Sequence, residues 1–468
     1  MKYSLPSLVA VLLSGIVAAP HATAQCLLGA DLSYANEVGD AGGVYRDTEG
    51  NEVDVYRYFA DRGADMVRLR LWYTPGNIPA SCGGQITSSS LADVLRGARR
   101  AHDANMQVKL AIHYSDYFVD PGKQERPAAW AGLSGQVLSD SIFNYTLAVL
   151  GALRAQGTVP AIVAVGNETD NGFIDEGAPT DGFEWPADAA KFNAGLAAVD
   201  TFNARFGESC TKAIHLTERY ARFGAAEFTR NGITNFDMFG LSYYPKFDPE
   251  TTIEEFGDLV EHLVTTYDKQ VIVAETGFAW TRTGFADDYN NFLSSNGNVV
   301  TQPTSREGQR DFLIALTREV FARGGTGVLY WEPAWVTSDM CDRWGRGSSY
   351  ESATFFDFEN DNRALPAFDF LDCASVLSFR ENQPARQTVT VYPNPYQSNR
   401  LHLELADGER VNAWKLYGAA GELIDSSAAA VEGNFIDLEP WGDGFRFLSL
   451  ELASGQTVTV RILATHHE

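Results

Sequence analysis

The feature that most constrains the fold is a regular alternation of short β-like runs and longer helical patterns between residues 27 and about 378. The β-like runs occupy residues 27–32, 66–72, 107–114, 161–168, 212–217, 236–244, 271–275 and 327–332. Helical patterns, with apolar residues at i, i+3 and i+4, lie between them, such as those at 91–104, 142–155, 187–202, 253–267 and 309–322. Eight such repeats in about 350 residues predict an α/β fold, a (β/α)8 TIM barrel with enlarged loops after its strands.

The composition changes after residue 377. Residues 379–387 contain Pro384 and few apolar side chains, which is typical of a linker. From residue 388 to 468, short alternating runs are separated by Gly, Asn and Pro clusters, a pattern that predicts a small antiparallel all-β sandwich. The expected domains are therefore a barrel at 25–378, this linker, and a sandwich at 388–468.

The first 24 residues are typical of a secretory signal peptide. Lys2 precedes an apolar run at 8–13, and Ala22-Thr23-Ala24 fits a small-x-small cleavage site. The apolar run is too short for a transmembrane segment, which needs about 20 residues. We therefore expect a secreted protein, extracellular or at the cell surface, without a membrane anchor.

The net charge of −25 restricts the class of partner. A polyanion such as nucleic acid would be repelled, so we expect no nucleic acid and no anionic polysaccharide. A neutral polysaccharide is compatible with this charge. We expect the protein to act as a monomer.

Five cysteines leave one unpaired, and none of them has the spacing of a zinc site. In an oxidising compartment, disulfides are expected. The predicted barrel brings Cys26 near Cys82 and Cys341 near Cys373, so we expect these two pairs, with Cys210 free.

Glu168 and Glu275 each end a run of β-forming residues. A (β/α)8 barrel keeps its chemistry at the carboxyl ends of its strands. Two carboxyl groups that meet there can hydrolyse a glycosidic bond, one as acid/base and the other as nucleophile. We expect Glu168 to be the acid/base, beside Asn167 that can hold a sugar hydroxyl, and Glu275 to be a nucleophile kept ionised by Arg68 or Arg70. The alternative is that each glutamate caps a helix or pairs with an arginine.

Other polar and aromatic residues follow the predicted strands. Alternation places Arg68, Arg70 and Trp72 on one side of the second strand, and the alternative to a site role for the arginines is a structural Arg–Asp pair. His113 and Asp116 follow the third strand and are expected at the same rim; a lone histidine there can also be structural. Aromatic rings stack on sugars, and those at the sixth and eighth strand ends are the best candidates: Tyr243, Tyr244 and Trp331.

The loop after Glu275 contains Asp287, Asp288, Asn290 and Asn298. Oxygen ligands at this spacing are compatible with a structural Ca²⁺ site, and the alternative is a solvated acidic loop. No cofactor is expected to be required for catalysis.

Eight segments in order resemble glycoside hydrolase family 53, the endo-β-1,4-galactanases, from Gly29 to about Leu371. They are 29–33, 68–72, 113–116, 120–124, 165–168, 240–245, 275–277 and 330–335. The resemblance implies a retaining double displacement on β-1,4-galactan, a pectin side chain, with Glu168 as acid/base and Glu275 as nucleophile. The substrate-binding residues expected from the segments and the patterns above are Asp31, Arg68, Arg70, Trp72, His113, Asp116, Asn167, Tyr243, Trp331 and Trp335.

The sequence departs from the family at Phe118 and Phe247, where the family usually has tryptophan, so these subsites are expected to differ. Two other functions remain open. One is another enzyme with a two-glutamate barrel, such as a β-1,4-mannanase or xylanase. The other is a galactan-binding protein without activity.

Residues 388–468 resemble a C-terminal sorting domain of the type IX secretion system, through segments 391–395, 416–418 and 421–423. This resemblance implies export across the outer membrane through that secretion machinery, with removal of the domain. The alternative is an ordinary β-sandwich that binds carbohydrate through Trp414 and Trp441.

Overall fold

The computed structural model describes residues 26–175, 182–282, 293, 295–378, 389–392, 400–405, 410–418, 423–431, 433–438, 444–453 and 457–464. The chain divides into two compact units, Met1–Leu377 and Ser378–Glu468. The expected signal peptide, linker and calcium ligands Asp287, Asp288 and Asn290 lie outside the described residues.

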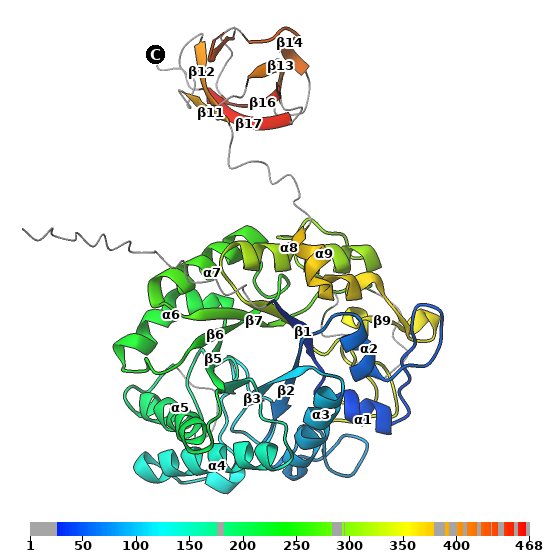
Figure 1. Cartoon of the computed structure of the whole chain (residues 1–468), viewed down its shortest axis with the longest axis vertical. Helices are drawn as coiled ribbons and strands as arrows, with labels where there is room; N and C mark the ends of the chain where they lie inside the picture. The colour runs from blue at the N-terminus through cyan, green and yellow to red at the C-terminus, as the bar shows by residue number, and fades with distance from the viewer. Residues whose placement is uncertain are drawn as a thin grey trace, which may run out of the picture. The chain divides into compact units, whose positions relative to one another are not determined.

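The first unit contains a closed barrel of eight parallel strands that follow one another in chain order (Figure 1). The strands are β1 (Leu27–Asp31), β2 (Met66–Leu71), β3 (Gln107–Ile112), β4 (Ile162–Val165), β5 (Thr211–Thr217), β6 (Met238–Tyr243), β7 (Gln270–Thr276) and β8 (Gly327–Tyr330). The barrel closes where β1 also pairs with β8, with Leu27 opposite Gly327. The predicted TIM barrel and its eight strands are therefore confirmed.

Helices surround this barrel on the outside (Figure 1). They are α1 (Ala35–Asp40), α2 (Val55–Asp61), α3 (Leu91–Asp103), α4 (Gly135–Ala155), α5 (Ala187–Phe206), α6 (Glu218–Arg230), α7 (Ile253–Tyr267), α8 (Arg306–Ala322) and α9 (Cys373–Ser378). Shorter elements complete the unit: η1 (Pro75–Asn77), η2 (Ala128–Trp130), η3 (Glu351–Ala353), β9 (Phe356–Asp357), η4 (Phe358–Asn360), β10 (Arg363–Ala364) and η5 (Pro366–Leu371). Local capping signals fix several starts; at α7 the Thr252 side chain and Glu255 form a capping box.

Strand alternation separates two layers of packing. In β2, Val67, Leu69 and Leu71 belong to the large hydrophobic cluster that also contains helix residues. Met66, one residue earlier, belongs to a second, small apolar cluster inside the barrel. Because successive side chains of a strand point to opposite faces, Arg68 shares the inner face with Met66. The inner face of this strand thus changes from apolar to charged within two residues.

The predicted disulfide pairing is wrong. The two disulfides join Cys26 with Cys373, and Cys82 with Cys341, while Cys210 is free and buried as expected. Cys26 precedes β1, at the amino-terminal end of the barrel, whereas Cys82 lies in the loop beyond the carboxyl end of β2. The two cysteines therefore belong to opposite ends of the barrel, which the order of elements along the chain does not make obvious.

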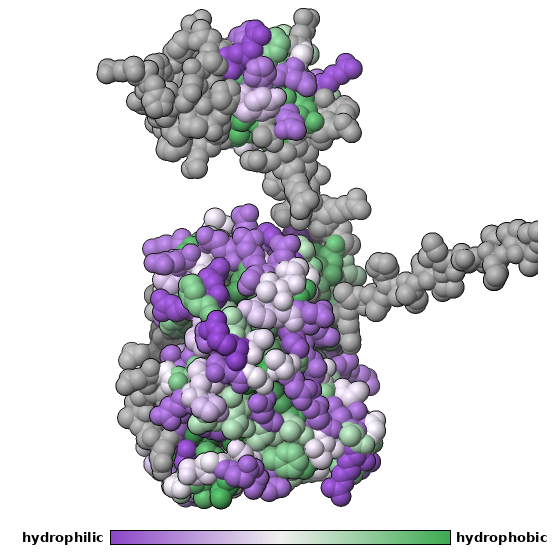
Figure 2. Space-filling view, turned by 90° about the vertical axis from the view of Figure 1, so that its left-hand side faces the viewer, coloured by the Kyte–Doolittle hydropathy of each residue, from purple (hydrophilic) through white to green (hydrophobic). Residues whose placement is uncertain are grey.

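On the face of the barrel drawn in Figure 2, hydrophilic and hydrophobic residues are interspersed. None of the helices in the described part of the chain is both long enough and apolar enough to cross a membrane.

The second unit is all-β. One antiparallel sheet has the order β11 (Val389–Tyr392), β12 (Arg400–Leu405) and β15 (Phe435–Asp437). The other has the order β14 (Leu423–Ser427), β13 (Val411–Tyr417), β16 (Gly444–Leu452) and β17 (Thr457–Ala464). One hydrophobic cluster draws on both sheets, including Leu403 of β12 and Leu448 of β16, as in a β-sandwich. Trp414 is buried in this cluster, so its ring is not an exposed platform; Trp441 lies outside the described residues.

Candidate active site

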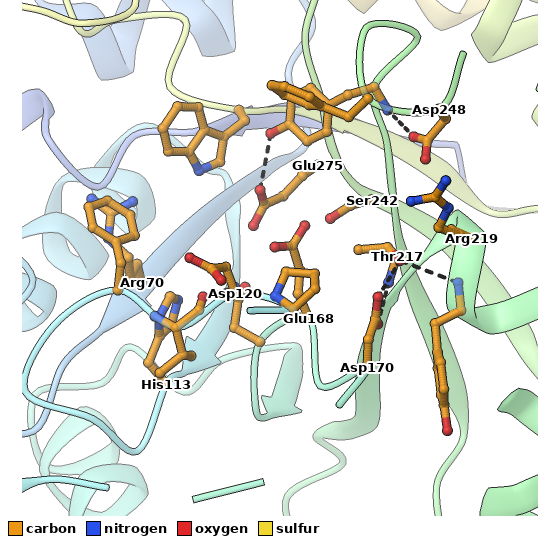
Figure 3. Close-up of a pocket in the computed structure, with 18 of the residues that line it drawn as sticks. Arg70, His113, Asp120, Glu168, Asp170, Thr217, Arg219, Ser242, Asp248 and Glu275 are labelled. Carbon is orange, nitrogen blue, oxygen red and sulfur yellow. Dashed lines mark hydrogen bonds between the residues drawn. The ribbon is translucent and has the colours of Figure 1, made fainter. Parts of the chain in front are cut away.

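A cavity of about 1010 Å³ lies at the carboxyl ends of the barrel strands. Its walls come from residues at or just after the ends of several strands, among them Glu168 after β4, Thr217 at the end of β5 and Glu275 in β7. Figure 3 shows the Glu168 and Glu275 carboxyl groups directed into the same space. The two glutamates predicted from the strand pattern are therefore brought together.

The backbone around Glu168 leaves strand geometry at once. Gly166 has φ 92° and Glu168 has φ 43°, both in the left-handed region that residues with a Cβ rarely adopt. A side chain at Gly166 would contact Thr169 at 2.6 Å, so glycine is required there. Such a conformation at a non-glycine residue persists only where the surroundings over-determine it, and it often marks a functional site.

Glu275 has a partner on each carboxylate oxygen. Arg68 Nη2 lies 2.7 Å from Oε1, and the Tyr244 hydroxyl donates to Oε2 at 3.0 Å. Because Glu275 is only 6% exposed, these two partners take the place of water around the carboxylate. They stabilise its ionised form.

Arg68 connects Glu275 to two further residues. Its guanidinium forms an ion pair with Asp31, and Nη2 also donates to Asn167 Oδ1 at 2.6 Å. Asn167 is fixed in turn, since its Nδ2 donates to the Val119 carbonyl at 2.9 Å. One arginine thus holds residues that come from β1, the end of β4, and β7.

The pKa values of the two glutamates are raised to different extents. Burial raises the pKa of Glu168 well above its usual value, and the nearby charge of Glu275 raises it further. Burial also raises the pKa of Glu275, but Arg68 opposes this, as do Tyr244 and Lys109. The arrangement favours a protonated Glu168 beside an ionised Glu275, the division of roles that acid/base chemistry needs.

His113 is a neutral hydrogen-bond donor at the cavity wall. Burial and the nearby Arg68 and Arg70 lower its pKa well below the usual value. Its Nδ1 accepts from the Val119 backbone N–H at 3.4 Å, so the proton of the neutral ring lies on Nε2. Among the described residues Nε2 is buried and has no hydrogen-bond partner.

Arg70 does not contact Glu275. Its Nη2 lies 3.0 Å from Glu332 Oε1, and its guanidinium lies 4.4 Å from the centre of the Phe118 ring. Tyr34 and Trp72 pack against it as well. Of the two arginines expected to serve the nucleophile, Arg68 has that position and Arg70 forms a separate buried pair.

Nine of the residues predicted for catalysis or substrate contact line the cavity: Arg68, Arg70, His113, Asn167, Glu168, Tyr244, Glu275, Trp331 and Trp335. Four do not. Asp31 is buried behind Arg68, and Trp72 is fully buried against Arg70 and Tyr117. Asp116 accepts from the backbone N–H of Thr74 at 2.9 Å and so holds a loop.

Tyr243 also lies away from the cavity. Its hydroxyl donates to the Thr251 carbonyl at 2.8 Å, and its ring stacks on Phe256 of α7. Tyr244, the next residue, points the opposite way and reaches Glu275. The register of β6 against β7 shifts between Leu241 and Ser242, a detail that a strand pattern does not reveal.

Other cavity residues are not among the site residues expected from the sequence, although three of them, Asp120, Pro121 and Ser242, lie in segments that carry the family resemblance. They are Val119, Asp120, Pro121, Asp170, Asn171, Thr217, Arg219, Tyr220, Phe223, Ser242, Asp248 and Ser349. Phe223 is 76% exposed on α6, and an aromatic residue on the polar face of that helix was the available signal. In the described part of the chain, no group of three His, Cys, Asp or Glu side chains is placed to hold a metal ion.

A (β/α)8 barrel with two facing carboxyl groups at its carboxyl-terminal mouth, one of them held by an arginine and a tyrosine, defines a glycoside hydrolase. Residues 27–371 match Glycosyl hydrolase family 53, and the chain belongs to this family.

Named relatives match the same region. An arabinogalactan endo-β-1,4-galactanase of Cellvibrio japonicus is 36% identical over 379 residues, which cover 79% of this chain and 97% of the relative. An endo-β-1,4-galactanase of Bacillus subtilis is 30% identical, with 73% of this chain and 82% of the relative covered. The solved GH53 catalytic domain of Ignisphaera aggregans is 28% identical with a TM-score of 0.66, covering 75% of this chain and 97% of that one. Fungal β-1,4-galactanase structures reach a TM-score of 0.62 at 26% identity, with 74% and 99% covered.

Proposed function

We propose that this protein is a secreted arabinogalactan endo-β-1,4-galactanase that cleaves with retention of configuration. In this proposal Glu275 is the nucleophile and Glu168 the general acid/base. The observation that carries it is the pairing of both Glu275 oxygens, by Arg68 and Tyr244, opposite a second carboxyl group, Glu168, whose pKa burial raises.

The reaction has two steps. In the first, Glu275 attacks the anomeric carbon while Glu168 gives its proton to the departing glycosidic oxygen, which leaves a galactosyl-enzyme ester on Glu275. In the second, Glu168 takes a proton from water, the water oxygen attacks the same carbon, and Glu275 is released as a carboxylate. Arg68 and Tyr244 hold Glu275 in line during attack and stabilise its charge when it leaves.

Several features support a neutral galactan as the substrate. Two named endo-β-1,4-galactanases resemble this chain over most of their lengths. The cavity offers aromatic rings for stacking on sugars, among them Trp331 and Trp344. The net charge of −25 disfavours a polyanion.

Export is part of the proposal. Two disulfides join distant segments of the barrel unit, and disulfides of this kind persist in oxidising compartments. The antiparallel second unit is compatible with a type IX sorting domain, and mass spectrometry of the mature protein from its natural host tests this. A mature form that retains residues 388–468 would contradict removal of that domain.

The central experiment is release of reducing ends from linear β-1,4-galactan, with β-1,4-mannan and xylan assayed alongside. Wild type should act on galactan, and Glu168→Gln and Glu275→Gln should abolish turnover while circular dichroism and Tm stay near wild type. Preference for mannan or xylan would replace the substrate assignment, and galactan binding without any cleavage by wild type would indicate a binding protein.

A further inference from the structure

The turn at residues 341–346 carries the exposed ring of Trp344 and is attached to another loop by the Cys82–Cys341 disulfide. Trp344 is 57% exposed and lines the cavity together with Phe118. The rings of the two residues stack, with centroids 5.6 Å apart and planes inclined by 23°. Tyr117 lies 5.4 Å from the same indole. A large exposed aromatic ring beside a sugar-binding cavity is a suitable platform for a sugar ring.

This ring belongs to a tight turn. Cys341 forms an antiparallel bridge with Arg346, and the Asp342 backbone N–H donates to the Gly345 carbonyl at 3.0 Å. The Trp344 backbone N–H donates to Asp342 Oδ1 at 2.8 Å. The turn is therefore internally fixed, and its position depends on how its base is attached to the rest of the barrel.

The base of the turn is attached to the loop after β2. The Cys82–Cys341 disulfide links the two loops, and the Ser81 backbone N–H donates to the Asp342 carbonyl at 2.8 Å next to it. These loops follow β2 and β8, which flank β1 in the barrel. Cys82 itself is exposed, so the disulfide does not lie in the core.

The platform is also connected to the polar part of the site. Phe118 contacts both the Trp344 ring and the Arg70 guanidinium, the latter at 4.4 Å. The Tyr34 hydroxyl donates to Asp342 Oδ2 at 3.4 Å, and the Tyr34 ring packs on Arg70. A shift of the turn would therefore change the place of the indole relative to Arg70 and the cavity.

We propose that the Cys82–Cys341 disulfide positions the Trp344 ring as a sugar platform away from the reacting bond. This inference rests on the proposed galactanase function. A crosslink that fixes a turn before substrate arrives reduces the ordering that binding would otherwise require. The partners of Trp344 among the described residues are Tyr117, Phe118 and Asp342, and not the two glutamates. Its contribution is therefore expected to be the same in the ground and transition states, which affects KM and not kcat.

The test compares the two disulfides of the chain. Replacing Cys82 and Cys341 together by serine should raise KM for galactan about three- to tenfold, the effect of about one side chain that must be ordered on binding, with kcat unchanged. Replacing Cys26 and Cys373 together by serine is the matched control. That disulfide joins the start of β1 to α9, so its loss should lower Tm and leave KM unchanged.

A double-mutant cycle separates positioning from general stability. Trp344→Ala alone should raise KM by about tenfold, within the range of one lost stacking contact. Adding the Cys82→Ser and Cys341→Ser changes to Trp344→Ala should give no further rise, because no ring remains to be positioned. A KM that is unchanged without the Cys82–Cys341 disulfide, or effects that simply add, would overturn the inference. Absence of wild-type activity on galactan would instead refute the proposed function.

Discussion

The interior of the barrel has two halves of opposite character on the same eight strands. The amino-terminal half is filled by apolar side chains: Leu27, Met66, Ile162, Ala164, Ala213, Met238, Ile272 and Leu329. The carboxyl-terminal half holds buried charged or polar groups: Asp31, Arg68, Arg70, Lys109, His113, His215, Glu275 and Glu332. In β2, a single residue separates Met66 of the first half from Arg68 of the second.

The two halves illustrate two ways of filling a barrel. Apolar groups in the amino-terminal half, here called the lower half, need only fit in shape and volume, and similar residues can replace one another at a small cost in stability. Buried charges in the carboxyl-terminal half, here called the upper half, lose their hydration. They are tolerated only where ion-pair or hydrogen-bond partners compensate for that loss, so each depends on its neighbours. The upper half therefore contributes geometry and pKa shifts for chemistry, and the lower half contributes packing.

The largest expected effect is at the two glutamates of the upper half. Glu275→Gln removes the nucleophile, and Glu168→Gln removes the proton donor; each should lower kcat by about 10³-fold or more. Neither change removes volume, so Tm should stay within a few degrees of wild type. Initial rates on galactan and thermal unfolding measure both. Near-wild-type rates in either variant would exclude that residue from catalysis.

The next effect contrasts two residues of one strand. Arg68→Met leaves Asp31 and Glu275 without their cation, and should lower kcat about 10²-fold and the free energy of unfolding by about 3–5 kcal/mol. Met66→Leu, on the same face one layer below, should cost less than about 1.5 kcal/mol and leave kcat unchanged. Steady-state rates and urea unfolding test the contrast. Equal losses in both variants would contradict the division into two halves.

The pH profile tests the proton assignment. Activity should fall at high pH as Glu168 loses its proton, and at low pH as Glu275 gains one. A hydrogen bond from Ser242 lowers the pKa of Glu168. Ser242→Ala should therefore raise that pKa and move the alkaline limb of kcat/KM to higher pH, whereas Ser349→Ala should leave it in place. A downward or absent shift in Ser242→Ala would argue against Glu168 as the group that titrates on that limb.

The smallest effect concerns Lys109, which faces the barrel interior without a hydrogen-bond partner among the described residues. Burial, with Arg68 nearby, lowers its pKa to about 7. Between that pH and its unfolded value of about 10.4, the unfolded chain binds more protons, so this group makes stability rise with pH. Lys109→Met should therefore raise Tm by about 1–2 °C near pH 6 and by less near pH 10, as calorimetry can measure. A gain that grows with pH would contradict the assignment.

Local patterns predicted the elements well where side chains are large. The eight strands are runs of β-formers, and helices such as α3 and α7 show clear apolar stripes. Helix α6 gives a weaker pattern, because much of its buried face is made of small residues, Ala221, Gly224 and Ala225, which give little apolar signal. The disulfide pairing does not follow from these local patterns, because it depends on which end of the barrel each loop occupies.

The site residues show the same difference between signals that are local in the sequence and contacts that depend on the whole barrel. The carboxylates at strand ends were visible because a polar residue that ends an apolar run is a local signal. Tyr244 was not separated from Tyr243, since the choice depends on a register shift between β6 and β7. Likewise, the alternation of one strand cannot distinguish the role of Arg68 from that of Arg70, because it places both side chains on the same face.

The sequence by itself determined the order of strands and helices, and the presence of Glu168 and Glu275 at strand ends, because both depend on residues close together in the chain. Only the tertiary structure decided which side chains pair with one another in the site and in the disulfides. Barrel closure brings Asp31, Asn167 and Glu275 around one guanidinium, and joins Cys82 to Cys341 across 259 residues. Contacts of this kind depend on register and closure, which are properties of the whole barrel.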